Sequence, residues 1–240
     1  MRDMSPSGPL AGRLALVTGA SRGIGAATAL ALGKGGAHVV LTARTPGGLE
    51  EIEDAIHAAG GSATIAPLDL ADGDAIPRLA TAISGRWDAL DILVLNAAQL
   101  GSLSPVSAFD AKEVSKTFTL NVSAQAALIG SFDAMLRKSE RPRVLGLTSS
   151  VARTPRAYWG MYGASKAAFE NLLLSYGAEV GQISKIRVGI VDPGATRTKM
   201  RARAYPGEAP LSVKPPETVA DRILTMLVDD FETGAFVRVD

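Results

Sequence analysis

A phenol and an ammonium stand four residues apart in this sequence, at Tyr162 and Lys166. Residues 162–180 have the periodicity of a helix, so the two side chains would lie on one face of it. A fixed positive charge favours phenolate, and we expect Lys166 to lower the pKa of Tyr162 from its ordinary value of about 10. Such a pair can donate and abstract protons. It can also be an ordinary surface contact on a helix, so its meaning depends on the elements around it.

Hydroxyl groups lie just upstream, in Thr148-Ser149-Ser150. They end a run of aliphatic residues that predicts a strand, and parallel sheets bind ligands where their strands end. A serine hydroxyl there can hydrogen-bond a substrate oxygen and stabilise the negative charge that develops on it. Ser149 and Ser150 are both candidates for this role. The alternative is that their hydroxyl groups only cap the strand end.

A glycine-rich turn at residues 19–25 leads from a predicted strand into an alanine-rich helix. Its glycines permit a tight turn, a close approach of the backbone to a pyrophosphate, and close packing of the helix on the strand. The amide groups at the start of the helix would face the phosphates. This context predicts a dinucleotide cofactor. Its expected contacts in the turn are Gly19, Ser21, Arg22, Gly23, Ile24 and Gly25.

The end of the second predicted strand indicates which nicotinamide cofactor is bound. Enzymes that use NAD place a carboxylate there, against the ribose 2′-hydroxyl. This strand instead ends in Ala43-Arg44, and Arg44 together with Arg22 could clamp a 2′-phosphate. We therefore expect NADP(H) in preference to NAD(H). The alternative is that both arginines are solvated surface groups.

Alternating strands and helices must position these residues. Short β-branched or aliphatic runs predict seven strands, at 14–18, 39–42, 63–68, 92–95, 144–148, 186–191 and 236–239. Helical periodicity is found at 24–34, 49–59, 75–84, 111–138, 162–180 and 217–228. Nearly continuous apolar strands with intervening helices are typical of an α/β fold with three layers, a doubly wound parallel sheet of the Rossmann type.

One such domain accounts for the whole chain of 240 residues. We expect it to span residues 12–240, behind a flexible tail at 1–11. A proline-rich stretch at 199–216 is expected to be a long loop with a turn of helix at its start, acting as a lid over the substrate.

Composition excludes several classes of function. With 25 basic and 24 acidic residues the formal charge is +1, so nucleic acid and anionic membranes are not favoured and a small molecule is the expected partner. There is no apolar run long enough to span a bilayer, no apolar signal core at the start and no cysteine, which fits a cytoplasmic protein. His38 and His57 have no acidic cluster at ligand spacing, so no metal site is expected.

The turn Thr-Gly-x-x-x-Gly-x-Gly and the pair Tyr-x-x-x-Lys resemble those of the short-chain dehydrogenase/reductase family, over nearly the whole chain from Gly12 onward. The resemblance implies that Tyr162 is the general acid/base and that Lys166 binds the nicotinamide ribose. It also implies that Asn121, inside a predicted helix, holds a water in a proton relay that reaches Lys166.

The resemblance also bears on the serine and on further cofactor contacts. Ser149 stands 13 positions before Tyr162, which is the family's usual spacing, and Ser150 remains open if the intervening loop is one residue shorter. Ala98 and Leu95 replace the family's usual glycine and first asparagine. Matching motifs imply cofactor contacts at Asp69, Leu70, Asn96, Ala97, Ala98, Pro193, Gly194, Thr196 and Thr198.

The activity implied by the resemblance is the transfer of a hydride between NADP(H) and a carbonyl/alcohol substrate. The main alternative is a catalytically inactive NADP(H)-binding sensor or scaffold, because fold alone never establishes activity. A sugar-nucleotide epimerase or dehydratase ranks third, since those proteins usually have another glycine spacing and a longer C-terminal domain.

Substrate choice and assembly depend on segments near the site. The loop at 151–161 and the lid are both basic, which suits either an anionic substrate or a solvated charged surface. Small residues on the helix at 162–180 suit close packing between subunits, so we expect a homo-oligomer, either a dimer or a tetramer. These small residues are Gly163, Ala164, Ala167 and Ala168.

Overall fold

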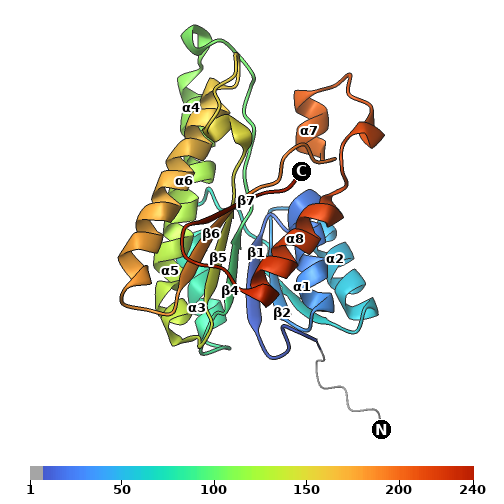
Figure 1. Ribbon diagram of the computed structural model, residues 1–240, viewed down its shortest axis with the longest axis vertical. Helices are drawn as coiled ribbons and strands as arrows, with labels where there is room; N and C mark the ends of the chain where they lie inside the picture. The colour runs from blue at the N-terminus through green and yellow to red at the C-terminus, as the bar shows by residue number, and fades with distance from the viewer. Residues whose placement is uncertain (1–7) are drawn as a thin grey trace.

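The fold is a parallel sheet with helices on both faces. The computed structural model describes residues 8–240 (Figure 1). Within these residues seven strands pair in the order β3-β2-β1-β4-β5-β6-β7, and every pairing is parallel. The order reverses between β1 and β4, where doubly wound sheets bind their ligands. The strands are β1 (Leu14–Thr18), β2 (His38–Thr42), β3 (Ser62–Ile65), β4 (Ile92–Leu95), β5 (Arg143–Leu147), β6 (Arg187–Asp192) and β7 (Ala235–Arg238).

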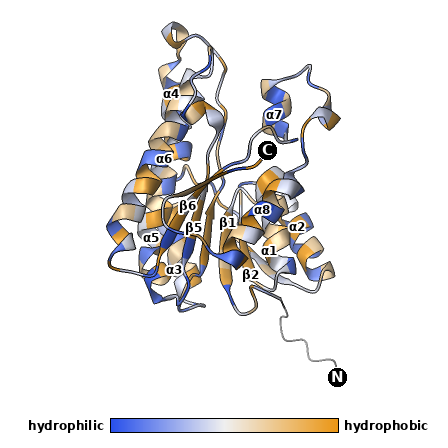
Figure 2. Cartoon of the chain, in the orientation of Figure 1, coloured by the Kyte–Doolittle hydropathy of each residue, from blue (hydrophilic) through white to orange (hydrophobic). Residues whose placement is uncertain are grey.

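Helices cover both faces of the sheet (Figure 1). One face carries α1 (Gly23–Lys34), α2 (Pro46–Ala58) and α8 (Pro216–Asp229). The other carries α3 (Ala75–Ser84), α5 (Ala124–Lys138) and α6 (Gly160–Gly181), and α4 (Ala111–Phe118) packs beside α6. A buried apolar cluster fills each interface, and the strands form an apolar layer between the helices (Figure 2). The expected three-layer α/β fold is confirmed. No helix among residues 8–240 is both long and apolar enough to cross a membrane.

Several element boundaries differ from the expectation by one to three residues. The third strand ends at Ile65 rather than at residue 68, although the amides of Ala66 and Leu68 still donate to the carbonyls of Leu41 and Ala43, at 2.8 and 3.1 Å. A π-helical turn at Thr119–Ser123 divides the helix expected at 111–138. Of the expected tail, residues 1–7 lie outside the described residues. Residues 8–11 are described, and there Leu10 is buried and its amide donates to the Gly35 carbonyl at 2.8 Å.

The stretch expected to be a lid contains more helix than a single turn. It holds α7 (Lys199–Ala204) and a 3₁₀ turn at Pro210–Ser212. Thr196 and Lys214 form a parallel bridge, and the Arg197 amide donates to the Lys214 carbonyl at 2.8 Å. Residues 197–214, which contain most of the stretch expected at 199–216 and are here named the lid segment, therefore leave and rejoin the domain at one place, beyond the carboxyl ends of the strands (Figure 1).

Candidate active site

The glycine turn has a shape that can receive a pyrophosphate. Gly19 and Gly23 have φ angles of +66° and +58°, in the region that favours glycine. A Cβ on Gly25 would lie 2.3 Å from the Gly19 carbonyl oxygen, so only glycine fits where α1 approaches β1. The first turn of α1 contains no acidic side chain, and no side chain caps it. Its free amide groups and positive dipole end can therefore hold a phosphate.

Thr18 and Asn96 tie together the ends of the two strands at the reversal point. The Thr18 hydroxyl donates to the Val94 carbonyl at 3.2 Å and accepts from the amides of Asn96 and Ala97, each at 3.0 Å. Asn96 Nδ2 donates to the Thr18 carbonyl at 2.8 Å. Sequence reasoning expected the asparagine to brace this edge but overlooked Thr18, which the motif places directly before Gly19.

The expected contacts to the adenosine half follow β2 and β3. Arg22 directly precedes α1 and Arg44 follows β2; both are exposed, and within residues 8–240 neither forms an ion pair. Asp69 is also exposed, and its Oδ1 accepts from the Ala71 amide at 3.0 Å, while Leu70 is buried. The two guanidinium groups are therefore free to bind an anion beside the glycine turn.

Pro193 and Gly194 begin the loop that follows β6 and reaches the same turn. Gly194 has φ +60° and its amide donates to Asp192 Oδ1 at 3.0 Å. The buried Thr196 hydroxyl donates to the Pro193 carbonyl at 2.9 Å, and Thr198 Oγ1 accepts from the Arg201 amide at 3.1 Å, capping α7. A Cβ on Gly23 would lie 3.3 Å from Thr198 Cγ2, so the loop after β6 faces the glycine turn directly.

Tyr162 and Lys166 lie in the first turns of α6 and are both buried, with 7% and 3% of their surfaces exposed. Lys166 Nζ donates to the Leu147 carbonyl at 2.7 Å and lies 5.9 Å from the centre of the Tyr162 ring. Burial lowers the pKa of Lys166 to about 8. Burial, and secondly the carboxylate of Asp192, raise the pKa of Tyr162 above its ordinary value.

The expected lowering of the Tyr162 pKa is thus wrong for this structure. Burial disfavours the phenolate, and the ammonium that should stabilise it is itself disfavoured by burial and is bound to a carbonyl. The phenol therefore keeps its proton at neutral pH. A protonated phenol can act as a proton donor.

Asn121 connects the π-helical turn to the helix of the tyrosine. Its side chain is fully buried; Nδ2 donates to the Gln99 carbonyl and to Ser165 Oγ, each at 2.9 Å, and Oδ1 accepts from the Gln99 amide at 2.9 Å. Ser165 Oγ in turn donates to the Tyr162 carbonyl at 2.8 Å. Asn121 therefore fixes the first turn of α6. Sequence reasoning singled out neither Gln99 nor Ser165, although Ser165 stands directly before Lys166.

The two candidate serines lie where the chain leaves β5. Ser149 is extended, with φ −157° and ψ 149°, whereas Ser150 is the first residue of a 3₁₀ turn. Both are half-buried, and within the described chain neither hydroxyl has a side-chain hydrogen bond. Both hydroxyls are therefore free to bind a substrate oxygen, and the geometry of the chain leaves either serine available.

A buried carboxylate binds the residues on both sides of the segment 149–152, which we call the serine turn. Glu170 is 6% exposed and lies one helical turn after Lys166. Its Oε1 accepts from Thr148 Oγ1 at 2.6 Å, and its Oε2 accepts from Arg153 Nε at 2.8 Å. Sequence reasoning did not single out Glu170. Its position among apolar residues on the helix of Tyr162 could have indicated a buried carboxylate.

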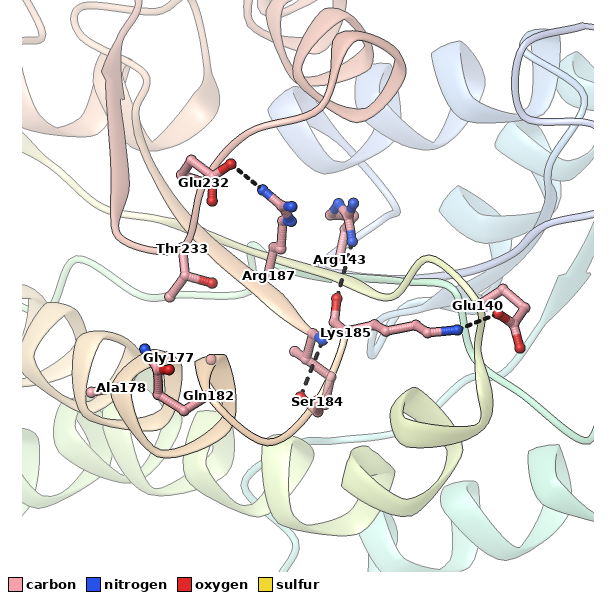
Figure 3. A pocket seen from close by; sticks show the side chains of 12 residues that line it. Glu140, Arg143, Gly177, Ala178, Gln182, Ser184, Lys185, Arg187, Glu232 and Thr233 are labelled. Atoms are coloured by element: carbon pink, nitrogen blue, oxygen red, sulfur yellow. Dashed lines mark hydrogen bonds and ion pairs between the residues drawn. The ribbon is translucent and has the colours of Figure 1, made fainter.

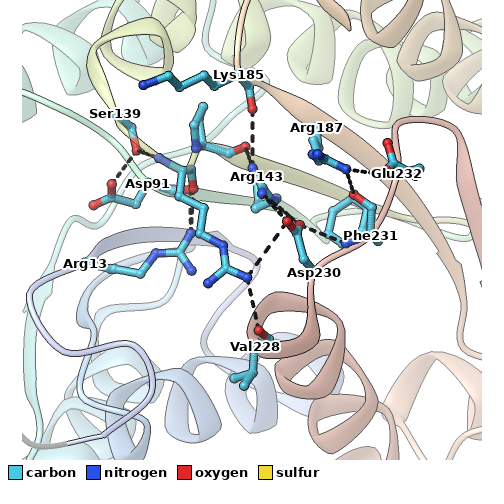
Figure 4. A network of polar contacts seen from close by, with 12 residues as sticks. Arg13, Asp91, Ser139, Arg143, Lys185, Arg187, Val228, Asp230, Phe231 and Glu232 are labelled. Atoms are coloured by element: carbon cyan, nitrogen blue, oxygen red, sulfur yellow. Dashed lines mark hydrogen bonds and ion pairs between the residues drawn. The ribbon is translucent and has the colours of Figure 1, made fainter.

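A polar cavity of about 650 Å³ lies at the opposite end of the sheet, beside the first residues of β5 and β6 (Figure 3). Its basic side chains already have partners: Arg143 is paired with Asp230 and Arg187 with Glu232 (Figure 4). Parallel sheets bind ligands at the carboxyl ends of their strands, where Tyr162 lies. We therefore assign this cavity to the framework of the fold and not to the active site.

Known proteins share this sequence and this arrangement. Residues 13–209 match the short chain dehydrogenase family. The uncharacterized oxidoreductase YciK of Escherichia coli K12 is 34% identical over 221 residues, which cover 91% of this chain and 87% of that one. A short chain dehydrogenase from Salmonella enterica serovar Typhi is 32% identical, with a TM-score of 0.92 and 97% of each chain covered.

A metagenomic short-chain oxidoreductase solved in complex with NADP is 32% identical to this chain, with a TM-score of 0.82, and the match covers 97% of this chain and 99% of that one. The family match spans most of the described domain, and the parallel sheet and glycine turn have the expected form. The chain therefore belongs to the short-chain dehydrogenase/reductase family of oxidoreductases.

Proposed function

We propose that this oxidoreductase transfers a hydride between NADP(H) and a carbonyl/alcohol substrate. The observation that carries the proposal is the burial of Tyr162 and Lys166 together at the carboxyl edge of the sheet, with Lys166 held by the Leu147 carbonyl at 2.7 Å. Two buried titratable groups at a ligand-binding edge are suited to proton transfer.

Each residue has a distinct part in the proposed reaction. In reduction Tyr162 donates its proton to the substrate oxygen, and Ser149 stabilises the charge on that oxygen, with Ser150 as the alternative. Lys166 binds the ribose hydroxyls and replenishes the proton. The bound nicotinamide supplies or accepts the hydride. Because Asn121 Nδ2 is already used by Gln99 and Ser165, a relay water at Asn121 is held by an oxygen atom of that residue.

The free arginines beside the glycine turn support NADP(H) as the cofactor. Neither Arg22 nor Arg44 has an acidic partner among residues 8–240, and the end of β2 contributes no carboxylate that would repel a 2′-phosphate. Gly19, Ser21, Gly23, Ile24 and Gly25 would hold the pyrophosphate, and Asp69, Leu70, Asn96, Ala97, Ala98, Pro193, Gly194, Thr196 and Thr198 would hold the remaining parts of the cofactor.

The cofactor proposal is tested by titrating the purified protein with NADPH and NADH and following nicotinamide fluorescence. Arg44→Ala and Arg22→Ala should each weaken NADPH binding at least about tenfold, because each removes a charge-assisted contact, and should leave NADH binding unchanged. Arg78→Ala is the matched control, since Arg78 is an exposed arginine on α3. Equal loss for both cofactors, or none, would refute the 2′-phosphate contact.

A measurement of NADPH oxidation distinguishes the proposed enzyme from the alternative of a non-catalytic sensor or scaffold. NADPH binding without oxidation by any member of a panel of ketones and aldehydes would favour the non-catalytic alternative. Oxidation of NADPH that requires Tyr162 would favour the enzyme.

We also propose that the protein forms a homo-oligomer, at least a dimer. Ala164 and Ala167 are exposed on α6. A cavity of about 650 Å³ between α5 and α6 is lined by apolar side chains such as Ile129 and Leu172 and also by the charged Asp133, Arg137 and Glu179. Gly163, however, packs within its own chain, because a Cβ there would lie 2.8 Å from the Val151 carbonyl oxygen. Sedimentation of a monomer alone at working concentrations would refute this proposal.

A further inference from the structure

The face of the lid segment that covers Tyr162 is apolar. Met200 and Ala204, one turn apart on α7, pack on a cluster that contains Tyr162. The other members of the cluster also lack charge: they are Leu100, Leu103, Val151 and Trp159. Lys199 and Arg203 of the same helix are exposed. The short helix therefore presents Met200 and Ala204 to the cluster that contains the proposed proton donor, and two of its basic side chains to solvent.

Aromatic rings connect the lid segment to Tyr162. The Trp159 ring meets the Tyr162 ring edge-on, at 6.1 Å between centres and an angle of 64°. Trp159 also lies 5.7 Å from the ring of Tyr205, which directly follows α7. Large rings of this kind contribute much apolar area and favour contact with apolar or aromatic groups.

The two arginines that contact Tyr205 already have polar partners. Arg201 donates to both carboxylate oxygens of Glu208, at 2.7 and 2.5 Å, and stacks on the Tyr205 ring at 3.7 Å. Arg156 donates to the Tyr205 hydroxyl at 3.3 Å. An anionic substrate would have to compete with Glu208 for Arg201. Among the basic residues of the lid segment, Arg201 is thus neutralised by Glu208, and Arg197, Lys199 and Arg203 are exposed.

We infer that the substrate carries an apolar alkyl or aryl group on its carbonyl carbon, and that this group packs against Met200, Trp159 and Val151. The inference rests on the proposed reaction at Tyr162 and adds its substrate class. Burying an apolar group against these side chains removes apolar surface from water on both partners, whereas a carboxylate in the same place would lose its hydration without gaining a partner.

The first test compares two matched series in NADPH-dependent reduction: 2-alkanones from butanone to decanone, and keto acids of equal length that end in a carboxylate. Each added methylene in the ketones should raise kcat/KM by about threefold to fourfold until the apolar face is covered. Each keto acid should be at least about tenfold poorer than its ketone. A flat ketone series, or keto acids that equal or exceed the ketones, would overturn the inference.

A binding measurement separates this inference from the proposed reaction. In Trp87→Phe the only remaining tryptophan is Trp159, so its fluorescence reports on the pocket. Saturable quenching by 2-decanone in the presence of NADP, together with no oxidation of NADPH by any ketone or keto acid of the two series, would support the apolar site and refute the proposed reaction. Turnover confined to keto acids would support the reaction and refute the apolar site. Absence of both quenching and ketone turnover, with NADPH binding intact, would overturn the inference.

Two variants of the lid segment locate the contact. Met200→Gln places a polar amide on the inner face, and Leu211→Gln makes a similar change at a side chain that is 86% exposed. Met200→Gln should raise KM for 2-decanone several-fold and leave butanone nearly unchanged, whereas Leu211→Gln should leave both unchanged. If Met200→Gln had no effect on the dependence on chain length, the inner face of the lid would not be the site.

Discussion

The Thr148 hydroxyl donates to Glu170 Oε1 at 2.6 Å, and this buried bond joins the end of β5 to the helix of Tyr162. The same carboxylate accepts from Arg153, so both sides of the Ser149 turn are attached to one residue of α6. Lys166 also donates to the Leu147 carbonyl, so α6 holds two successive residues at the end of β5, Leu147 and Thr148, and Arg153 beyond the 3₁₀ turn. The distance between the serine turn and Tyr162 therefore depends on Glu170.

Thr148→Val should lower the free energy of unfolding by about 1–3 kcal/mol, because it removes a hydrogen bond to a buried carboxylate. It should also lower kcat more than it raises KM for NADPH, since the serine turn moves while the glycine turn does not. Urea unfolding and steady-state kinetics measure the two effects. Thr28→Val is the matched control: Thr28 is fully buried but its hydroxyl has no partner among the described residues, so no loss is expected.

Tyr162→Phe should lower kcat by about 10²- to 10⁴-fold, the usual contribution of a positioned general acid. NADPH affinity should change little, because the variant keeps the ring and Lys166 keeps its bond to Leu147. Stopped-flow measurement of substrate reduction gives the change in rate, and fluorescence titration gives the change in NADPH affinity. A variant that keeps most of its activity would show that the proton comes from another group.

The stability of the fold should rise with pH above 8 because of Lys166. Burial lowers its pKa from 10.5 to about 8, so between these values the unfolded chain binds more protons than the folded chain. The free energy of unfolding should therefore increase by about 1.5 kcal/mol between about pH 8 and 9.5. Urea unfolding across this range tests the effect. Lys166→Met should remove the increase, and an equal slope in both proteins would contradict a buried, poorly solvated ammonium.

The sequence predicts the layers of the fold and the cofactor turn well, because both depend on local pattern. Apolar runs of strand length and the glycine spacing of residues 19–25 are read directly from neighbouring residues. Tyr162 and Lys166 are placed together for the same reason, since four residues make about one turn of helix. Spacing alone, however, does not reveal burial, and burial reverses the expected shift in the Tyr162 pKa.

The supporting residues of the site are not predictable in this way. Asn121 reaches Gln99 across 22 positions and Ser165 across 44, and these contacts exist only after the helices have packed on the sheet. The π-helical turn at Asn121 likewise depends on tertiary contacts, because helical periodicity on both sides of it is uninterrupted. Ion pairing within the lid segment also weakens the argument for an anionic substrate that its basic composition suggested, since Glu208 neutralises Arg201.

Asp230→Ala should destabilise the fold by about 3–5 kcal/mol without changing KM for either substrate. Asp230 has φ +75° and ψ 166°, a backbone conformation that is strained for residues other than glycine, and it accepts from Arg143 Nε and Nη2, each at 2.8 Å (Figure 4). The Arg143 side chain is only 4% exposed, so the variant leaves a buried cation without its partner.

Glu232→Ala is the control for this ion pair. Glu232 pairs with Arg187 in the same network, but its side chain is 89% exposed, so its loss should cost less than about 1 kcal/mol. Both variants are compared with the natural protein by urea unfolding at neutral pH, with NADPH titration as the check on the distant site. Equal destabilisation by the two variants would mean that Arg143 finds other partners or water. In that case the strained backbone of Asp230 would have no compensating bond to explain it.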